Sequence, residues 1–288
     1  MMPREVIEYL DIKEDGTYVD CTFGSGGHSR DILGRLSSKG RLVSVDWDEE
    51  TVKNAEEKFS KYKNFSLSCD NFANLKDIAE KFNLAHIDGI VFDLGFSSSQ
   101  MGEKKRGFSF LGDAPLDMRY NSSNPLTAAV LLNSYSRDFL EKILTEYAQE
   151  RFSKRIAGEI ERYRKTKQIE TTKELVEIIH RATPAWYHHR RIHSATRTFQ
   201  AVRMAVNREI ENIEKGLAAA IDALSSRGRI VVISFHSVEH RCVKNIFRQA
   251  VRDGALSLAV KKPVLPSDTE IGSNPRARSA QMRVAEKT

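Results

Sequence analysis

Short β-rich runs alternate with amphipathic helical patterns through the first hundred residues of this 288-residue chain. The runs lie at 17–23, 41–45, 65–69 and 88–94, and helical patterns fit between them. Strands that alternate with helices form βαβ units, which build a parallel sheet with right-handed crossovers. The spacing therefore predicts a doubly wound, Rossmann-like α/β fold whose ligand lies at the carboxyl ends of the strands.

The alternation stops after Leu94, and helical patterns dominate the residues that follow. Ser136 has the residue type of a helix N-cap and precedes an apolar helical face. That face consists of Phe139, Leu140, Ile143, Leu144 and Tyr147. Thr171 and Glu174 have the spacing of a capping box for a further helix. We expect an inserted, all-helical domain at 106–205.

The α/β pattern returns in the last third of the chain. From Thr198 onward, apolar residues recur at spacings of three and four until Gly228. This periodicity predicts one long helix that the glycine stops. Strands are predicted at 229–235 and 281–285, with a helix between them. The α/β domain would then be discontinuous and consist of 1–105 and 206–288.

Positive charge is concentrated in the predicted insertion. The chain has a formal net charge of +6, and residues 151–208 alone contain fourteen Lys or Arg against five Glu, a surplus of nine. Clustered cations attract phosphates over a distance and release counterions when they bind them. The asymmetry favours a polyanionic partner, and the alternative is a solvated basic surface.

Several classes of protein are disfavoured by the sequence. No apolar run approaches the roughly 18 residues that a membrane helix needs, and the first residues lack the regions of a signal peptide. We therefore expect a cytoplasmic protein without membrane contact. Cys21, Cys69 and Cys242 are far apart and lack a Cys-x-x-Cys spacing, which indicates neither a disulfide framework nor a zinc site. We expect them to be buried thiols at strand ends.

A glycine-rich turn, Asp20-Cys-Thr-Phe-Gly-Ser-Gly-Gly-His-Ser29, follows the first predicted strand and opens a helix. Glycines let the backbone approach a ligand closely, and free N–H groups at a helix start favour a negative group. Asp46, at the end of the second predicted strand, has the position of an acid that accepts hydrogen bonds from both hydroxyls of an adenosine ribose. Together these features predict a nucleoside site.

The same turn argues against a dinucleotide. Ser29 occupies the position of the third glycine in Gly-x-Gly-x-x-Gly, so a pyrophosphate is not specifically provided for. S-adenosylmethionine needs only amides for its carboxylate, an acid for its ribose and a flat apolar neighbour for its adenine. Phe72 and Asp70, just past the third strand, are placed to flank the adenine, although Phe72 is alternatively a core aromatic. Asp93 ends the fourth strand beside the expected methyl group, with a helix cap as its alternative role.

Motif blocks spread over nearly the whole chain resemble the bacterial ribosomal small-subunit RNA methyltransferase H family. The blocks are the glycine-rich turn, Asp93-Leu-Gly-Phe-Ser-Ser, Arg106-Gly-Phe-Ser-Phe, Pro115-Leu-Asp-Met-Arg119, Glu150-Arg-Phe-Ser, Ala195-Thr-Arg-Thr-Phe-Gln-Ala201, Ile233-Ser-Phe-His-Ser237 and Asn274-Pro-Arg-Ala-Arg-Ser279. The resemblance implies a class I methyltransferase sheet with S-adenosylmethionine as cofactor. It also implies methylation of the exocyclic N4 of a cytidine, with 16S ribosomal RNA or the small ribosomal subunit as partner.

The resemblance extends to individual residues. It implies cofactor contacts at Gly26, Gly27, His28, Asp46, Phe72, Asp93 and Gln100. Departures from the family pattern lie elsewhere: Ala114 replaces a usual glycine, Ala148-Gln149 replaces Gly-Glu, His240 replaces an acid, and the extreme N-terminus looks trimmed. Ala114 is expected to alter the loop before Asp117.

Methyl transfer to cytosine N4 needs help, because the lone pair of this nitrogen is delocalised into the ring. The enzyme must orient the amine and accept its proton. Asp93 is the catalytic candidate, and Asp117 and His236 are alternatives. Aminomethyltransferases of the Asp-Pro-Pro-Tyr type place an acid or amide at the corresponding strand end, whereas this chain has Asp93-Leu-Gly-Phe. His236 is equally well explained as a structural histidine.

Two patterns are formally compatible with a metal, but we predict no metal site. His236-Ser-Val-Glu-His240 matches an inverzincin motif, yet its first histidine ends a strand instead of lying within a helix. His188, His189 and His193 lie beside Arg190, Arg191 and Arg197, which favours an RNA-facing edge where aromatic rings stack on bases. Exposed, solvated charge is the alternative there.

Two other functions remain open at this point. One is a DNA or protein methyltransferase, and the other is a non-catalytic RNA-binding protein that retains a cofactor fold. Asp46 and Asp93 are both present, which favours an enzyme. Nothing in the sequence indicates an oligomeric state.

Overall fold

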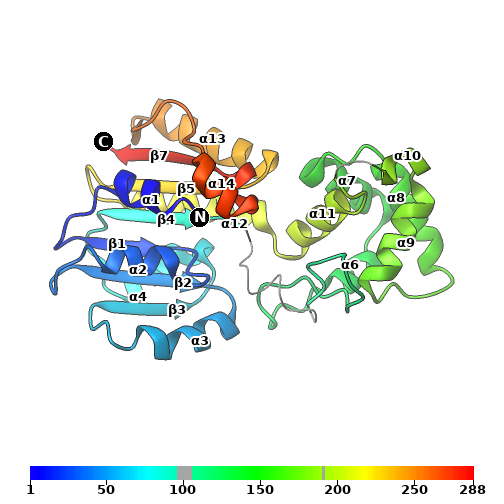
Figure 1. Cartoon of the computed structure of the whole chain (residues 1–288), viewed down its shortest axis with the longest axis horizontal. Helices are drawn as coiled ribbons and strands as arrows, with labels where there is room; N and C mark the ends of the chain where they lie inside the picture. Colours follow the sequence, from blue (N-terminus) through cyan, green and yellow to red (C-terminus); the bar gives the residue numbers. More distant parts are fainter. Residues whose placement is uncertain (96–105, 190–191) are drawn as a thin grey trace. The chain divides into compact units, whose positions relative to one another are not determined.

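The computed structural model describes residues 1–95, 106–189 and 192–288 (Figure 1). The chain divides into two compact units. Unit 1 consists of Met1–Phe96 and Ile210–Thr288, and unit 2 is Ser97–Glu209. Each unit has buried hydrophobic clusters of its own, so each is described by itself.

Unit 1 is built on a seven-stranded sheet with the order β3-β2-β1-β4-β5-β7-β6. The first five strands run parallel, and β7 runs antiparallel to both β5 and β6. The strands are β1 (Thr17–Asp20), β2 (Arg41–Asp46), β3 (Phe65–Cys69), β4 (Gly89–Asp93), β5 (Arg229–Ser234), β6 (Leu256–Leu258) and β7 (Gln281–Lys287). All six predicted strands are present, and the short β6 was not predicted.

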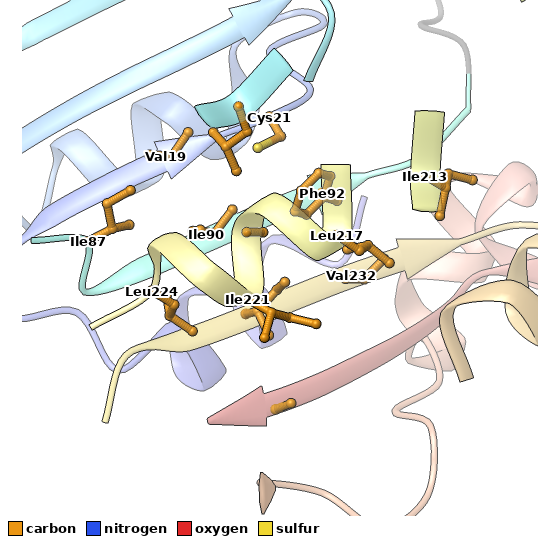
Figure 2. Packing of buried hydrophobic residues seen from close by; sticks show 14 of the residues in the cluster. Val19, Cys21, Ile87, Ile90, Phe92, Ile213, Leu217, Ile221, Leu224 and Val232 are labelled. Atoms are coloured by element: carbon orange, nitrogen blue, oxygen red, sulfur yellow. The ribbon is translucent and has the colours of Figure 1, made fainter. Parts of the chain in front are cut away.

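Helices cover both faces of this sheet, as the doubly wound prediction requires. One face carries α1 (Pro3–Leu10), α2 (Gly27–Leu33) and α3 (Glu49–Phe59), and the other carries α4 (Leu75–Lys81), α12 (Glu209–Ala223) and α13 (Ser237–Arg252). Side chains alternate along each strand, so Val91 packs in the first layer and Phe92 in the second. Figure 2 shows Leu217 and Ile221 of α12 beside Phe92 and Val232. Because both faces are covered, the central strands are buried along nearly their whole length.

Shorter elements complete unit 1. They are the 3-10 helices η1 (Phe72–Asn74) and η2 (Pro275–Ser279) and the short helix α14 (Asp268–Ser273). β1 ends at Asp20, earlier than the predicted 23, because the Thr22 N–H donates a hydrogen bond of 3.1 Å to Asp20 Oδ1 and turns the chain. The glycine-rich turn thus begins directly after Asp20.

The described part of unit 2 is helical. Its helices are α6 (Ala128–Ser134), α7 (Arg137–Ala148), α8 (Ser153–Arg164), α9 (Thr172–Ala182), α10 (Ala185–His188) and α11 (Thr196–Val206). Ser136 caps α7, and Thr171 with Glu174 forms the predicted capping box of α9, so both caps are confirmed. Of the predicted apolar face of α7, Leu140 and Leu144 are buried, whereas Phe139 lies at its exposed edge.

The single long helix predicted from Thr198 to Gly228 is wrong, because α11 and α12 are separate helices. The break falls at Asn207 and Arg208, and Arg208 has a positive φ of 49°. Asn207 Nδ2 donates a hydrogen bond of 2.7 Å to the Met118 carbonyl, and Asn207 Oδ1 accepts one of 2.7 Å from the Tyr120 N–H. The apolar spacing continues across the break, so periodicity cannot detect a turn held by distant backbone groups.

The cysteine prediction is confirmed for one residue of three. Cys21 is buried directly after β1. Cys69 is exposed, because β3 is the edge strand of the sheet, and Cys242 is half-buried within α13 instead of at a strand end. Among the described residues, no helix combines the length and apolar character needed to cross a membrane.

Candidate active site

Three parallel strands of unit 1 end in aspartates at one edge of the sheet. Asp20 ends β1, Asp46 ends β2 and Asp93 ends β4. Asp20 is paired in register with Ser44 and with Val91, so Asp46 and Asp93 each lie two residues beyond that level. The carboxyl edge of an α/β sheet is where such folds bind ligands.

The glycine-rich turn lies at the same edge and has two different steric requirements. Gly26 has a positive φ of 76°, and a Cβ there would lie 2.5 Å from the Phe59 ring and 2.7 Å from the Phe23 ring. Only glycine fits that position. A Cβ on Gly27, by contrast, would meet no atom within 4 Å. The backbone of Gly27 therefore borders open space into which a ligand fits.

Two backbone N–H groups orient the Asp46 carboxylate. The Gly24 N–H donates a hydrogen bond of 2.8 Å to Asp46 Oδ2, and the Asp48 N–H donates one of 2.9 Å to Oδ1. Burial raises the pKa of Asp46 to about 6. Each carboxylate oxygen retains a further lone pair, so this side chain can also accept hydrogen bonds from a vicinal diol.

His28 and Asp93 meet across the edge. His28 Nε2 lies 3.2 Å from Asp93 Oδ2, and the α-amino group of Met1 lies 3.4 Å from the same oxygen. His28 Nδ1 and Asp93 Oδ1 are buried and have no hydrogen-bond partner within the described residues. A buried polar atom without a partner costs about 1–3 kcal/mol, so two at one edge indicate a polar ligand there.

A supporting network behind these residues was not predicted. Ser29 Oγ donates a hydrogen bond of 2.6 Å to Asp20 Oδ2 and lies 2.8 Å from Ser44 Oγ. Thr22 Oγ1 accepts a hydrogen bond of 2.6 Å from the Asp93 N–H. Burial raises the pKa of Asp20, whose side chain anchors this network. Asp20, Thr22 and Ser29 belong to the glycine-rich motif, but the motif does not say what they contact.

The predicted adenine neighbours lie past β3. Phe72 begins η1, is half-buried and packs edge-on against Phe92 with ring centroids 5.5 Å apart. Asp70 Oδ1 accepts hydrogen bonds from Asn71 N and Asn74 Nδ2. Phe72 thus borders the core with part of its ring accessible. Gln100, the last predicted cofactor contact, lies outside the described residues.

Asp117, the alternative catalytic candidate, belongs to unit 2 and is held in an ion pair. Arg119 Nε and Nη2 donate hydrogen bonds of 2.8 and 2.7 Å to its two carboxylate oxygens. Burial raises the pKa of Asp117, but the hydrogen bonds and charge of Arg119 outweigh this effect and hold that pKa below its ordinary value. A carboxylate so engaged is a poor proton acceptor.

The loop before Asp117 accommodates its departure from the family pattern. Ala114 has no positive φ, and its carbonyl accepts a hydrogen bond of 2.9 Å from the Thr172 N–H. Alanine is therefore tolerated there. Gly107 is different, because its φ is 68° and an added Cβ would collide with the Pro115 carbonyl.

His236 takes part in a helix cap. Its Nδ1 accepts a hydrogen bond of 3.4 Å from the Glu239 N–H, and its Nε2 lies 3.1 Å from Glu239 Oε1. Glu239 Oε2 in turn accepts a hydrogen bond of 2.8 Å from the Phe235 N–H. His240 Nδ1 lies 2.6 Å from Ser234 Oγ. The cap bond at Nδ1 favours the structural role of His236, while its buried Nε2 makes no hydrogen bond within the described residues.

The predicted histidine edge of unit 2 is built by ring stacking. His188 stacks on His180 with centroids 4.3 Å apart, and its Nε2 lies 2.8 Å from Thr183 Oγ1. His193 stacks on Phe110 with centroids 4.5 Å apart. Arg190 and Arg191 lie outside the described residues. His180 also lies 6.1 Å from His193, so its ring borders both imidazoles.

Three features together define a class I methyltransferase. They are a doubly wound sheet with an antiparallel β7 between β5 and β6, a glycine-rich turn after β1, and an acid at the end of β2. A family model described as the MraW methylase family matches residues 1–288. The chain belongs to this family. Its activity is the S-adenosylmethionine-dependent methylation of the exocyclic N4 of a cytidine in ribosomal RNA.

The solved structures to which the chain is similar are distant from it in sequence. An rRNA methylase from Streptococcus thermophilus is 10% identical, with 99% of this chain and 93% of that chain covered and a TM-score of 0.46. TrmN from Thermus thermophilus is 9% identical, with 100% and 48% covered and a TM-score of 0.48. A SAM-dependent O-methyltransferase from Thermotoga maritima is 11% identical, with 99% and 64% covered and a TM-score of 0.44. The family assignment rests on the full-length family match.

Proposed function

We propose that the carboxyl edge of unit 1 binds S-adenosylmethionine and that Asp93 accepts the proton of the target amine. The observation that carries this proposal is the pair of buried, unpartnered atoms, His28 Nδ1 and Asp93 Oδ1, at the same edge as Asp46. Both atoms lack a partner within the described residues, which suits a site that a polar ligand completes.

Each proposed cofactor contact follows from local geometry. The backbone at Gly26 and Gly27 faces the methionine end, because open space begins at Gly27. Asp46 accepts hydrogen bonds from the ribose hydroxyls, and the accessible part of Phe72 packs against the adenine. Gln100 belongs to the proposed set by family resemblance. When bound, S-adenosylmethionine supplies an activated methyl group and a neutral leaving group.

Asp93 is the better of the two carboxylates for proton acceptance. Its Oδ2 lies beside His28, which leaves Oδ1 to accept a hydrogen bond from the N4 amine and to orient the nitrogen lone pair. The amine becomes acidic as the methyl group transfers, and the carboxylate then takes its proton. Asp117 is less suited to this role, because Arg119 pairs with its carboxylate and lowers its pKa.

We further propose that residues 106–205 recognise RNA and that the partner is 16S ribosomal RNA within the small ribosomal subunit. The surplus of positive charge at 151–208 supports a polyanionic partner. Such a substrate implies that the protein acts in the cytoplasm, where ribosomes assemble. Methyl transfer to DNA or protein, or RNA binding without turnover, are the alternatives that the sequence alone left open, and either result would contradict this proposal.

The decisive experiment is tritium transfer from labelled S-adenosylmethionine to unmodified small ribosomal subunits, followed by nucleoside analysis. Label is expected in N4-methylcytidine. With cofactor at saturating concentration, Asp93→Ala is expected to lower kcat about 10²- to 10⁴-fold, the usual range for loss of a general base. Asp77→Ala, which removes an exposed carboxylate on α4, is the matched control and is expected to retain full activity.

Other outcomes identify the competing functions. Label in DNA or protein, with none in the subunits, would replace the substrate. Cofactor binding with no label in any acceptor would leave an RNA-binding protein without turnover. Equal activity of Asp93→Ala and the control would remove Asp93 from its proposed role.

A further inference from the structure

Unit 2 contains a cationic pocket of about 680 Å³, formed by α7, α8 and the C-terminal end of α9. Five cations line it together with a single carboxylate. They are Arg137, Lys154, Arg155, Arg162 and Arg181, and the carboxylate is that of Glu159. The volume falls within the range of about 300–1,000 Å³ that is typical of ligand sites. The lining residues predict an anionic occupant.

Most of this charge is not neutralised by the protein. Glu159 is buried and pairs with Arg162 at 2.5 Å. Within the described residues, no carboxylate forms an ion pair with Arg137, Arg155 or Arg181. Gly158 lies between them on α8 and keeps the pocket open beside the Arg137 guanidinium. Repulsion among the unpaired cations is relieved when an anion binds.

An exposed aromatic surface continues from this pocket. Arg155, which lines the pocket, lies 6.0 Å from the centre of the Phe152 ring, and Phe152 lies 5.9 Å from Trp186. Arg151 lies within 6 Å of both rings. The side chain of Trp186 is 50% exposed. A large indole open to solvent beside cations has the chemistry of a nucleobase stacking platform.

Buried neighbours hold Trp186, the stacking platform, in place. Tyr187 is buried, and its hydroxyl donates a hydrogen bond of 2.9 Å to the buried Glu150 carboxylate. Its ring packs edge-on against Phe152 at 5.0 Å. Glu150 also accepts a hydrogen bond of 2.9 Å from the Phe152 N–H. Trp186 therefore projects from a fixed base, which reduces the entropy lost when a partner stacks on it.

We propose that the pocket binds phosphates of a single-stranded RNA segment and that Trp186 stacks on one of its bases. This inference rests on the proposed RNA substrate and specifies where unit 2 contacts it. A single strand is favoured over a duplex because only an unstacked base can present its face to an indole. The pocket supplies affinity without base specificity, since arginines here meet phosphate oxygens.

The first test compares two double variants that each remove two positive charges from unit 2. Arg155→Gln with Arg181→Gln alters the pocket, and Lys165→Gln with Lys173→Gln alters exposed residues that do not line it. The pocket variant is expected to raise the Kd for unmodified small subunits at least tenfold, with kcat and cofactor affinity unchanged. Its plot of log affinity against log salt is expected to flatten by about 0.7 for each lost phosphate contact. Equal effects of the two double variants would overturn the phosphate site.

The second test concerns the stacking platform. Trp186→Ala is expected to raise the Kd for subunits about tenfold, in line with the loss of one base–aromatic stack, whereas Trp186→Phe retains most of the affinity. Thermal unfolding of both variants is the control for folding. Unchanged affinity in Trp186→Ala would overturn the platform. If the wild-type protein itself fails to bind or methylate RNA, the proposed function fails; if it succeeds and every variant matches it, only this inference fails.

Discussion

Asp46 is the residue whose ionisation controls the proposed cofactor site. Burial raises its pKa to about 6, and ribose hydroxyls donate hydrogen bonds to the ionised carboxylate. Affinity for S-adenosylhomocysteine is therefore expected to fall as the pH drops from 7.5 to 5.5, when measured by titration calorimetry. Asp46→Asn is expected to bind at least tenfold more weakly and to lose this pH dependence. An unchanged pH profile in the variant would assign the effect to another group.

The same shift has the opposite consequence for the unliganded fold. A carboxyl whose folded pKa lies above its unfolded value stabilises the folded state in its protonated form. The contribution of Asp46 is thus absent well above pH 6 and grows as the pH falls toward its unfolded pKa of 3.8. Asp20, whose pKa burial also raises, contributes in the same direction. As the pH falls, cofactor binding at this edge of the sheet is therefore expected to weaken before unit 1 unfolds.

Gly26 and Gly27 are adjacent but are expected to respond differently to a methyl group. Gly26→Ala places a Cβ against Phe59 at a positive φ, so it is expected to destabilise the fold by about 1–3 kcal/mol. Gly27→Ala meets no protein atom and is expected to leave the Tm unchanged. If the open space holds the cofactor, Gly27→Ala nevertheless weakens cofactor binding. Normal affinity in Gly27→Ala would show that the cofactor does not approach this point.

At the scale of elements, the end of α7 offers a test of local strain. Gln149 caps this helix in the left-handed conformation, with a φ of 51°. Glycine adopts this conformation without steric cost, so Gln149→Gly is expected to raise the free energy of unfolding by about 0.5–1 kcal/mol. Denaturant unfolding measures the change. Lower stability would mean that side-chain contacts of Gln149 outweigh the backbone term.

Elements with local signals were predictable from the sequence. Six strands, the Ser136 cap and the Thr171–Glu174 capping box each depend on residues close together in the chain. The break between α11 and α12 was not predictable, since Asn207 is held by Met118 and Tyr120 from a distant segment. Exposure of Cys69 likewise depends on β3 being an edge strand, which only the assembled sheet determines.

Some residues of the candidate site were likewise predictable from the sequence, and others were not. Asp46 and Asp93 were predicted because an acid at the end of a parallel strand has a known position relative to the ligand edge. The roles of Thr22 and Ser29 were missed, because each bridges elements whose neighbours depend on strand order. Sequence position was enough to place the two aspartates at this edge, whereas the groups that orient them could be found only from the fold.

At the scale of the whole molecule, the two units have separate hydrophobic cores, so a substitution in one core is expected to destabilise that unit alone. Leu144 is buried in the core of unit 2, and Leu217 is buried in a core of unit 1. Leu144→Ala is expected to destabilise unit 2 by about 2–5 kcal/mol while cofactor affinity is retained. Leu217→Ala, the matched change, is expected to impair cofactor binding as unit 1 unfolds. Calorimetric scanning with and without S-adenosylhomocysteine distinguishes the two, and loss of cofactor binding in both variants would mean that the units unfold as one.

The pairing of β4 with β5 has a consequence for biosynthesis. These neighbouring strands are separated in the chain by the whole of unit 2. Translation proceeds at about 5–20 residues per second, so a nascent chain carries β4 for several seconds before its partner emerges. Unit 2 is contiguous and can fold during that interval, whereas the apolar border of the unfinished sheet stays uncovered. The insertion thus causes a delay during synthesis, in which chaperones have access to the incomplete sheet of unit 1.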